Sequence, residues 1–295
     1  MNPLLQAQDL SLPPRLQGFS LTLNTGEVTG LLGINGAGKS SALMALAGVL
    51  PGVRGSLQIK GQELSRQLAL RRHIGWLPQH PALYPDLSVR ENLVFFGALR
   101  LQAPAGNEQV EQTLQRFSLT PLQRRLTHRL SGGERMRLAL ACTLIHEPEI
   151  LLLDEPTAGL DPLQAEQLRE LIQQECGQRG VLIASHLLPD IEQLCERVLL
   201  MDAGCIVADE PLTGAPRLVR LSLLRPPADT QLTAIDGIAR VVSRHNAELL
   251  IELSPTAPDD LSETVAGYSW GLLAWEPTRA DLLARFRALS TGEVA

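Results

Sequence analysis

Short, continuous apolar runs mark the buried strands that this sequence predicts. Residues 28–32, 150–153 and 181–184 are runs of this kind, as expected for parallel strands covered on both faces. Segments with apolar residues at helical spacing follow them, for example at 43–50. Strand and helix alternate in this way through about residue 212, which predicts an α/β domain with a mostly parallel sheet over residues 1–212.

Residues 80–130 break this alternation because only helical patterns occur there. Apolar positions recur at helical spacing near Glu91, Asn92 and Leu93, and again over 109–117. We therefore expect a helical subdomain inserted into the α/β domain.

The composition changes at residues 211–216, a proline-rich segment typical of a linker. Beyond it, residues 217–295 show the rhythm of a small α+β domain. The expected elements, in chain order, are a strand at 218–224, a helix at 230–235, strands at 239–244 and 248–253, a helix at 258–266, a strand at 270–275 and a helix at 279–289. The order βαββαβ predicts a ferredoxin-like split βαβ unit.

A glycine-rich segment lies between the strand at 28–32 and the helix that follows it. It reads Gly33-Ile34-Asn35-Gly36-Ala37-Gly38-Lys39-Ser40-Ser41 and matches the pattern G-x-x-x-x-G-K-[ST]. Glycines allow the backbone to curl so that successive N–H groups face one anion at the helix N-terminus. Lys39 adds a cation for the phosphates, and the Ser40 hydroxyl is an expected Mg²⁺ ligand. Alone, the motif indicates only a held phosphate, and a glycine-rich turn with a surface lysine is the plainer alternative.

Two carboxylates follow the apolar run at 150–153. Asp154 and Glu155 come at the carboxyl end of that strand, where open α/β sheets bind their ligands. Asp154 is expected to hold Mg²⁺ through water, and Glu155 to act as the general base on the attacking water. A solvated Asp-Glu-Pro turn is the alternative. His186 follows the apolar run at 181–184, and by itself it indicates little.

The segment Ser131-Gly132-Gly133-Glu134 fits a capping box, with Ser at the N-cap and Glu three residues later. A capped helix start is therefore the structural interpretation. The same segment exposes N–H groups at the positive end of a helix dipole, which suits a phosphate presented from outside.

These four motifs, in this order, resemble those of the nucleotide-binding subunit of ATP-binding-cassette (ABC) proteins. The resemblance covers residues 4–212 and implies a P-loop NTPase cassette that binds and hydrolyses ATP with Mg²⁺. It also implies that the segment 131–134 completes the site of a second copy, so that ATP holds two subunits together. Those subunits would form a homodimer or a paired cassette.

The resemblance assigns further roles to single residues. His186 would contact the γ-phosphate and the attacking water. Gln79 would reach Mg²⁺ and link hydrolysis to the helical subdomain, whose boundary with the core would receive a cytoplasmic helix of the membrane partner. Asp161 would couple the two sites across the seam between subunits.

Three features depart from the family pattern. Glu134 stands where Gln is usual, and Ser40 where Thr is commoner. The stretch 9–18 holds no aromatic residue to stack on adenine, so Leu12 or Pro13 is the expected apolar support and base selectivity stays open.

Composition limits the possible partners. The chain has 295 residues, a net charge of −6 and a pI near 5.6, which argue against a broad nucleic-acid surface. Its four cysteines show no C-x-x-C spacing, and Cys142 falls on an apparent core face, which favours a reduced cytosolic setting. No apolar run approaches the roughly 20 residues needed to span a bilayer, and no signal segment begins the chain. A transporter pore would then be formed by separate permease subunits, with this chain peripheral on the cytoplasmic face of the inner (plasma) membrane.

Weaker patterns point to one subgroup. Residues 87–93 and the tail, with Glu276, Leu282, Leu283 and Phe286, resemble the ATPases of type-2 ABC exporters of the drug-resistance and gliding-motility kind. The main alternative is a soluble ABC mechanoenzyme acting on a ribosome or DNA complex, although the chain lacks a second cassette and a coiled-coil insertion. A kinase or GTPase would leave the motif at 131–134 and His186 unexplained.

Overall fold

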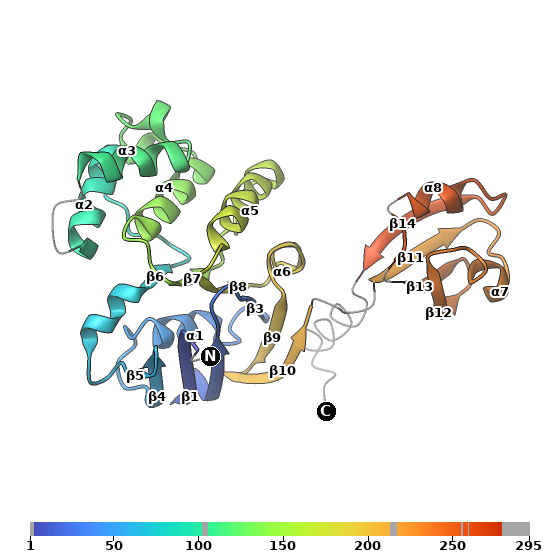
Figure 1. The fold of residues 1–295 in the computed structure, drawn as a ribbon, viewed down its shortest axis with the longest axis horizontal. Coiled ribbons are helices and arrows are strands. Elements are labelled where there is room, and N and C mark those ends of the chain that lie inside the picture. The colour runs from blue at the N-terminus through green and yellow to red at the C-terminus, as the bar shows by residue number, and fades with distance from the viewer. Residues whose placement is uncertain (1–2, 102–105, 213–216, 255, 259, 279–295) are drawn as a thin grey trace. The chain divides into compact units, whose positions relative to one another are not determined.

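The computed structural model describes residues 3–101, 106–212, 217–254, 256–258 and 260–278. The chain divides into two compact units, Met1–Leu212 and Thr213–Ala295 (Figure 1). The helix predicted at 279–289 lies outside the described residues, and so do the tail positions Leu282, Leu283 and Phe286. Most of the predicted linker, 213–216, lies outside them as well.

A six-stranded sheet forms the centre of the first unit. Its strands are, in spatial order, β10 (Cys205–Pro211), β9 (Arg197–Asp202), β3 (Val28–Leu32), β8 (Gly180–Ser185), β7 (Ile150–Asp154) and β6 (Ile74–Leu77). Every neighbouring pair is parallel except β10 and β9. All residues of β3, β7 and β8 are buried, because helices and a second sheet cover both faces. The predicted mostly parallel sheet is confirmed.

A second, antiparallel sheet was not predicted. It consists of β2 (Leu16–Leu23), β1 (Leu5–Leu12), β4 (Arg54–Ile59) and β5 (Gln62–Glu63), in that spatial order. Between the two sheets lies α1 (Lys39–Leu46), whose Leu43 and Leu46 are fully buried. They share one core cluster with Phe19 of β2 and Leu152 of β7. This packing fixes α1 and, with it, the position of its first residue, Lys39.

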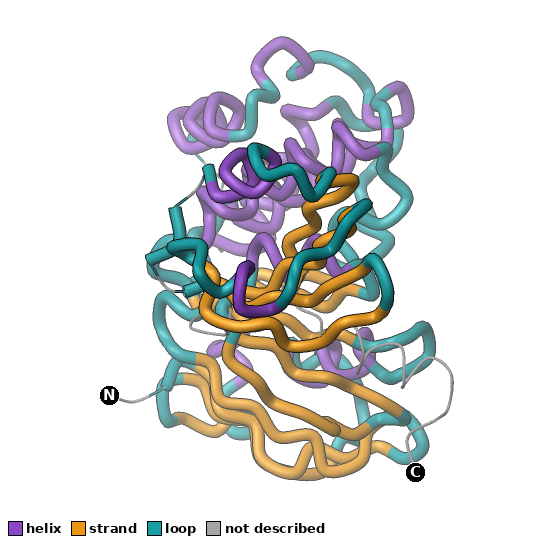
Figure 2. The backbone as a smooth tube through the Cα atoms, turned by 90° about the vertical axis from the view of Figure 1, so that its right-hand side faces the viewer, coloured by secondary structure: helices purple, strands orange, loops and turns teal. Residues whose placement is uncertain are grey.

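Several further helices belong to this unit. The bounds are η1 (Leu68–His73), α2 (Val89–Leu101), α3 (Asn107–Arg116), η2 (Thr120–Leu122), η3 (Thr127–Arg129), α4 (Gly132–Leu144), α5 (Pro162–Cys176) and α6 (Leu188–Leu194). Figure 1 shows α2, α3 and α4 grouped at one end of the unit, away from the antiparallel sheet, and Figure 2 shows helices gathered at the same end. The fully buried Asn92 helps to fix this group, since its amide donates to Thr127 Oγ1 at 2.9 Å and to the carbonyls of Tyr84, Leu87 and Ser88.

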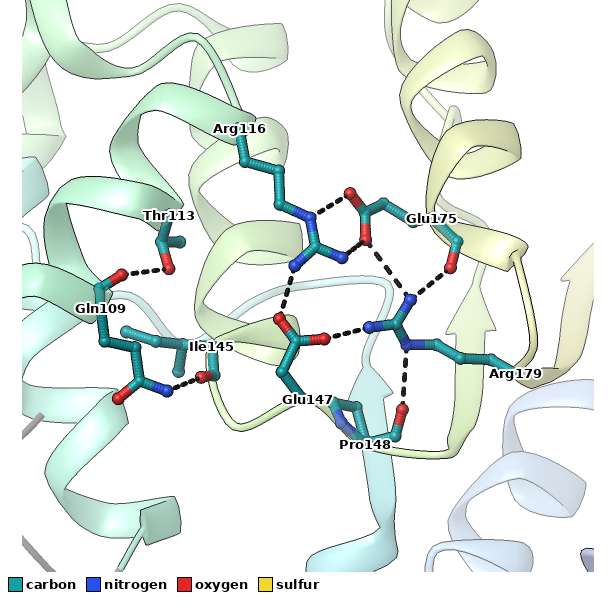
Figure 3. A network of polar contacts seen from close by, with 8 residues as sticks. All are labelled: Gln109, Thr113, Arg116, Ile145, Glu147, Pro148, Glu175 and Arg179. Atoms are coloured by element: carbon teal, nitrogen blue, oxygen red, sulfur yellow. Dashed lines mark hydrogen bonds and ion pairs between the residues drawn. The ribbon is translucent and has the colours of Figure 1, made fainter.

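An ion-pair network joins α3 to α5 (Figure 3). Arg116 of α3 pairs with the buried Glu175 near the end of α5 and with Glu147. Arg179 pairs with the same two carboxylates and donates to the Pro148 carbonyl at 2.9 Å. Because Glu175 is 4% exposed and fully partnered, this network fastens the inserted helices to the sheet unit.

The second unit contains one four-stranded antiparallel sheet with two short helices. Its elements are β11 (Arg217–Leu223), α7 (Asp229–Leu232), β12 (Ile238–His245), β13 (Glu248–Leu253), α8 (Leu261–Ala266) and β14 (Leu272–Thr278). The spatial order β12-β13-β11-β14 is that of a ferredoxin-like βαββαβ unit, as predicted. Trp270 and Trp275 pack against its core, in agreement with a structural role. In neither unit do the described residues form a helix long and apolar enough to cross a membrane.

Candidate active site

The loop between β3 and α1 curls tightly because glycine occupies its critical positions. Gly38 has φ +106°, and a Cβ there would lie 2.6 Å from the carbonyl oxygen of Arg15. A Cβ at Gly33 would lie 2.5 Å from the carbonyl oxygen of Met201. No larger residue fits at either place, so the sequence pattern follows from the path of the backbone.

Lys39, the first residue of α1, is buried with 6% of its surface exposed. Its Nζ donates to the carbonyl oxygens of Gly33 at 2.7 Å and Ile34 at 3.2 Å. The same ammonium lies 3.2 Å from Glu155 Oε1, which is also buried. A buried cation needs such partners, and the ion pair with Glu155 supplies an opposite charge.

Glu155 connects Lys39 to His186. Its Oε2 lies 2.7 Å from His186 Nδ1, and the His186 backbone N–H also donates to it at 3.3 Å. The strand register produces this meeting, because β7 and β8 are neighbours and Asp154 pairs with Ala184. Glu155 has φ +50°, a left-handed conformation that is costly for a residue with a side chain and is common at functional sites.

Asp154 is buried at 3% exposure, and its Oδ1 has no hydrogen-bond partner among the described residues. Burial raises the pKa of Asp154 above its ordinary value; a hydrogen bond with Ser40 opposes the rise, and the Glu155 charge adds to it. A buried, unpartnered carboxylate oxygen beside a hydroxyl fits Mg²⁺, which prefers oxygen ligands. Asp154 and Ser40 therefore have the oxygen atoms, burial and proximity that a Mg²⁺ site requires.

A cavity of about 410 Å³ lies against the loop, which we term the phosphate cavity. Its lining residues are Arg15, Asn35, Gly36, Gly38, Lys39, Ser40, Ser41, Gln79 and Glu155. Most of the predicted site residues of this region are thus brought together, including the distant Gln79. Leu12 and Pro13 are not among the lining residues. Arg15, from the turn between β1 and β2, lines the cavity instead, although no sequence motif marks it.

The segment 131–134 lies elsewhere. Ser131 caps α4 as predicted: its Oγ accepts from Glu134 N at 3.2 Å, and Glu134 Oε2 accepts from Ser131 N at 2.8 Å. A separate cavity of about 250 Å³, termed the signature cavity, is lined by Leu122, Ser131, Gly133, Glu134, Arg137, Gln164, Gln167 and Leu168.

Asp161 supports the signature cavity from the neighbouring helix. It caps α5, since its Oδ1 accepts from Gln164 N at 3.0 Å. Gln164 Oε1 in turn accepts from Gly133 N at 3.0 Å. Leu160, next to Asp161, lies close to Gly132: a Cβ added at Gly132 would be 3.5 Å from Leu160 Cδ2. The residues 131–134 and Asp161 are therefore close to one another and do not line the phosphate cavity.

Comparison with known proteins decides the family. The family described as ABC transporter matches residues 16–158. The linearmycin resistance ATP-binding protein LnrL of Bacillus subtilis is 33% identical over 251 residues, which cover 81% of this chain and 80% of the relative. The chain belongs to the ATP-binding proteins of ABC transporters. The daunorubicin resistance ATP-binding protein DrrA3 of Streptomyces coeruleorubidus agrees, at 33% identity over 79% of this chain and 84% of the relative.

Solved structures support the same assignment. The structure of cbiO1 from Clostridium perfringens, described as part of the ABC transporter complex cbiONQ, matches this ABC cassette with a TM-score of 0.63. The two are 30% identical, and the match covers 72% of this chain and 90% of the other. The fold is therefore the P-loop NTPase cassette, and the chain is an ABC ATPase that binds ATP.

Proposed function

We propose that this ABC ATPase is the ATP-hydrolysing subunit of a type-2 exporter and works as a homodimer beneath separate membrane subunits. Two similar proteins are named for resistance to linearmycin and to daunorubicin, which favours export. The chain of contacts from Lys39 through Glu155 to His186 is the observation that carries the catalytic part of this proposal.

Nucleotide binding is assigned to the phosphate cavity. The backbone N–H groups of residues 33–38 and the Lys39 ammonium hold the phosphates of ATP. Ser40, Gln79 and Asp154 would hold Mg²⁺, which offsets phosphate charge when it is bound. The phosphates compete with Glu155 for Lys39, so binding frees Glu155 Oε1 from its ion pair.

Glu155 then serves as the general base. Its carboxylate accepts a proton from the attacking water while the water oxygen bonds to the γ-phosphorus and the bond to the ADP oxygen breaks. The products are ADP and inorganic phosphate. His186 orients Glu155 through the 2.7 Å contact, and it would contact the γ-phosphate of bound ATP.

Two copies are needed because the signature cavity lies apart from the phosphate cavity. Ser131, Gly132, Gly133 and Glu134 form the start of α4, where N–H groups and the helix dipole favour an anion. We assign them to the γ-phosphate bound by the partner copy. Asp161 and Gln164 support this surface and lie at the seam between copies.

A third cavity suits the membrane partner. It has a volume of about 190 Å³ and is lined by Trp76, Leu77, Pro78, Pro81, Ala82, Leu83, Phe96, Arg100, Ala139, Cys142 and Thr143. We assign it to an apolar cytoplasmic helix of the permease. Gln79 follows Pro78 directly and lines the phosphate cavity, so one short segment connects the two cavities. The subunit would then lie peripherally on the cytoplasmic face of the inner (plasma) membrane.

Purification of the tagged full chain from detergent-solubilised membranes tests this assignment. We expect a membrane chain with several spanning segments to copurify in a ratio near one to one, and ATP hydrolysis by the complex. Copurification of ribosomal proteins or DNA instead would support a soluble mechanoenzyme and contradict the exporter proposal.

A further inference from the structure

A buried carboxylate lies directly behind the catalytic turns. Asp190 of α6 has no exposed surface. Its Oδ2 accepts from Thr157 Oγ1 at 2.6 Å and from Ser185 Oγ at 2.9 Å. Its Oδ1 accepts from Arg169 Nη1 of α5 at 3.1 Å. All of these groups lie outside the lining of the phosphate cavity, and no sequence motif assigned a role to Asp190, Thr157 or Arg169.

Two partners of Asp190 lie beside the catalytic residues. Thr157 follows Glu155 by two positions in the turn after β7, and Ser185, the last residue of β8, directly precedes His186. Ser185 Oγ also accepts from Leu187 N at 3.0 Å, so it fixes the backbone on both sides of His186. One carboxylate therefore joins the Glu155 turn to the His186 turn.

The Glu155 backbone needs such support. Its φ of +50° is unfavourable for a residue with a side chain, and such conformations persist only where the surroundings hold them. Thr157 is 2% exposed, and its hydroxyl bond to Asp190 fixes the turn from the buried side. Arg169 supplies an opposite charge 3.1 Å from Asp190, and charge-assisted hydrogen bonds of this kind are stronger than neutral ones.

We propose that Asp190 is a positioning residue for ATP hydrolysis: it holds the turns after β7 and β8 in register, so that Glu155 and His186 meet beside Lys39. This inference rests on the proposed roles of Glu155 and His186. Asp190 itself touches neither the phosphate cavity nor the reacting atoms. A small displacement of either turn would lengthen the 2.7 Å contact between Glu155 and His186 and misplace the base.

Glu175 of α5, the helix that also carries Arg169, provides a matched comparison. It is also a buried carboxylate paired with arginine, in this case Arg116 and Arg179 (Figure 3). Its partners do not include the turns after β7 and β8. Loss of either carboxylate removes one ion-pair partner from arginines that the fold holds in place, so both substitutions should reduce stability. Only Asp190 should also affect hydrolysis.

The experiment compares Asp190→Asn with Glu175→Gln in the full chain. For each variant, kcat and KM for ATP, the Kd for ATP by equilibrium titration and the melting temperature are measured. We expect Asp190→Asn to reduce kcat at least tenfold while the Kd stays within threefold of wild type. Glu175→Gln should keep kcat within twofold despite a lower melting temperature. Equal kcat for the two variants, or loss of kcat that follows the melting temperature alone, would overturn the proposal.

A second pair of variants covers the case in which Asp190→Asn does not fold. Thr157→Val removes the hydroxyl donor to Asp190 and keeps the shape, whereas Thr157→Ser keeps the hydroxyl. We expect a several-fold lower kcat for Val and a value within twofold of wild type for Ser. Equal effects of Val and Ser would refute the role of the hydrogen bond. Absence of ATP hydrolysis by the wild-type chain, with or without its permease, would instead contradict the proposed function itself.

Discussion

The phosphate cavity and the signature cavity belong to one unit but offer different chemistry. The phosphate cavity contains a buried cation, Lys39, and a carboxylate, Glu155, that lies 3.2 Å from it. The signature cavity presents the start of α4 with polar side chains such as Ser131 and Gln164. One region therefore holds the groups for proton transfer and metal binding, while the other combines a helix N-terminus with polar side chains and Arg137. The difference suggests that neither cavity alone forms a complete site.

Substitution of Glu155 by Gln should give the largest effect, because an amide cannot accept the proton of water. We expect kcat to fall at least about a hundredfold, about 2.7 kcal/mol in the barrier, with ATP binding retained. The same substitution at Glu134, in the signature cavity, should change kcat less than about tenfold, since Gln also completes a capping box. Steady-state assays and ATP titration measure both. Retention of a tenth of normal turnover by Glu155→Gln would show that the base is another group.

His146, just after the C-terminal end of α4, allows a test of folding stability that does not involve the catalytic groups. Burial, aided by the Arg100 charge, lowers the pKa of His146 to about 4. The unfolded chain binds a proton near pH 6.5, so the contribution of neutral His146 is full above that pH and is lost as the pH falls toward 4. Between pH 7 and pH 5 wild type should lose about 2 kcal/mol more unfolding free energy than His146→Gln. Urea unfolding at both pH values measures this, and equal losses in the two proteins would contradict it.

Arg15 should contribute to nucleotide affinity from the rim of the phosphate cavity. Its planar guanidinium has no ion pair or hydrogen bond from its side chain in the part of the chain that the structure describes, and Arg15 lines the cavity whereas Leu12 and Pro13, the expected support for the base, do not. Stacking on a base or contact with a phosphate is worth about 0.5–2 kcal/mol. We expect Arg15→Ala to weaken ATP binding about three- to tenfold. Arg15→Lys, which keeps the charge, and Arg15→Tyr, which keeps a stacking surface, separate the two contributions. Unchanged affinity in Arg15→Ala would remove this residue from the site.

The smallest expected difference is that between the affinities for ATP and for GTP. A guanidinium stacks on any base, and no aromatic residue in the stretch 9–18 reads adenine. ATP and GTP should therefore bind within about tenfold of each other, by titration of the same preparation. A preference for ATP beyond about a hundredfold would show that another residue recognises the base.

The parts of the site that follow from local sequence could be predicted. The loop around Gly38, the strand end at Asp154 and the cap at Ser131 each depend on residues within a few positions of one another. The mostly parallel character of the sheet could be predicted as well, since apolar runs and helices alternate along the chain.

Other features depend on contacts between distant segments and carry no local pattern. Arg15 reaches the cavity only because the antiparallel sheet places its turn beside Gly38. Asp190 has partners 33 and 21 positions away, and a lone Asp within a short helix has no distinctive pattern. The direct contact between Glu155 and His186 likewise requires that β7 and β8 be neighbours.

Activity of mixed dimers tests most directly whether the two cavities are halves of one shared site. A Lys39→Ala chain cannot hold ATP. In a Ser131→Arg chain, the larger and charged side chain blocks the signature cavity. Each should be inactive alone, because every composite site in either homodimer has one defective half. The mixed dimer pairs one intact Lys39 with one intact Ser131, so we expect partial ATPase activity to return. Verified mixed dimers that stay inactive, while a dimer of wild type with the double variant hydrolyses ATP, would contradict the shared site and place catalysis within one chain.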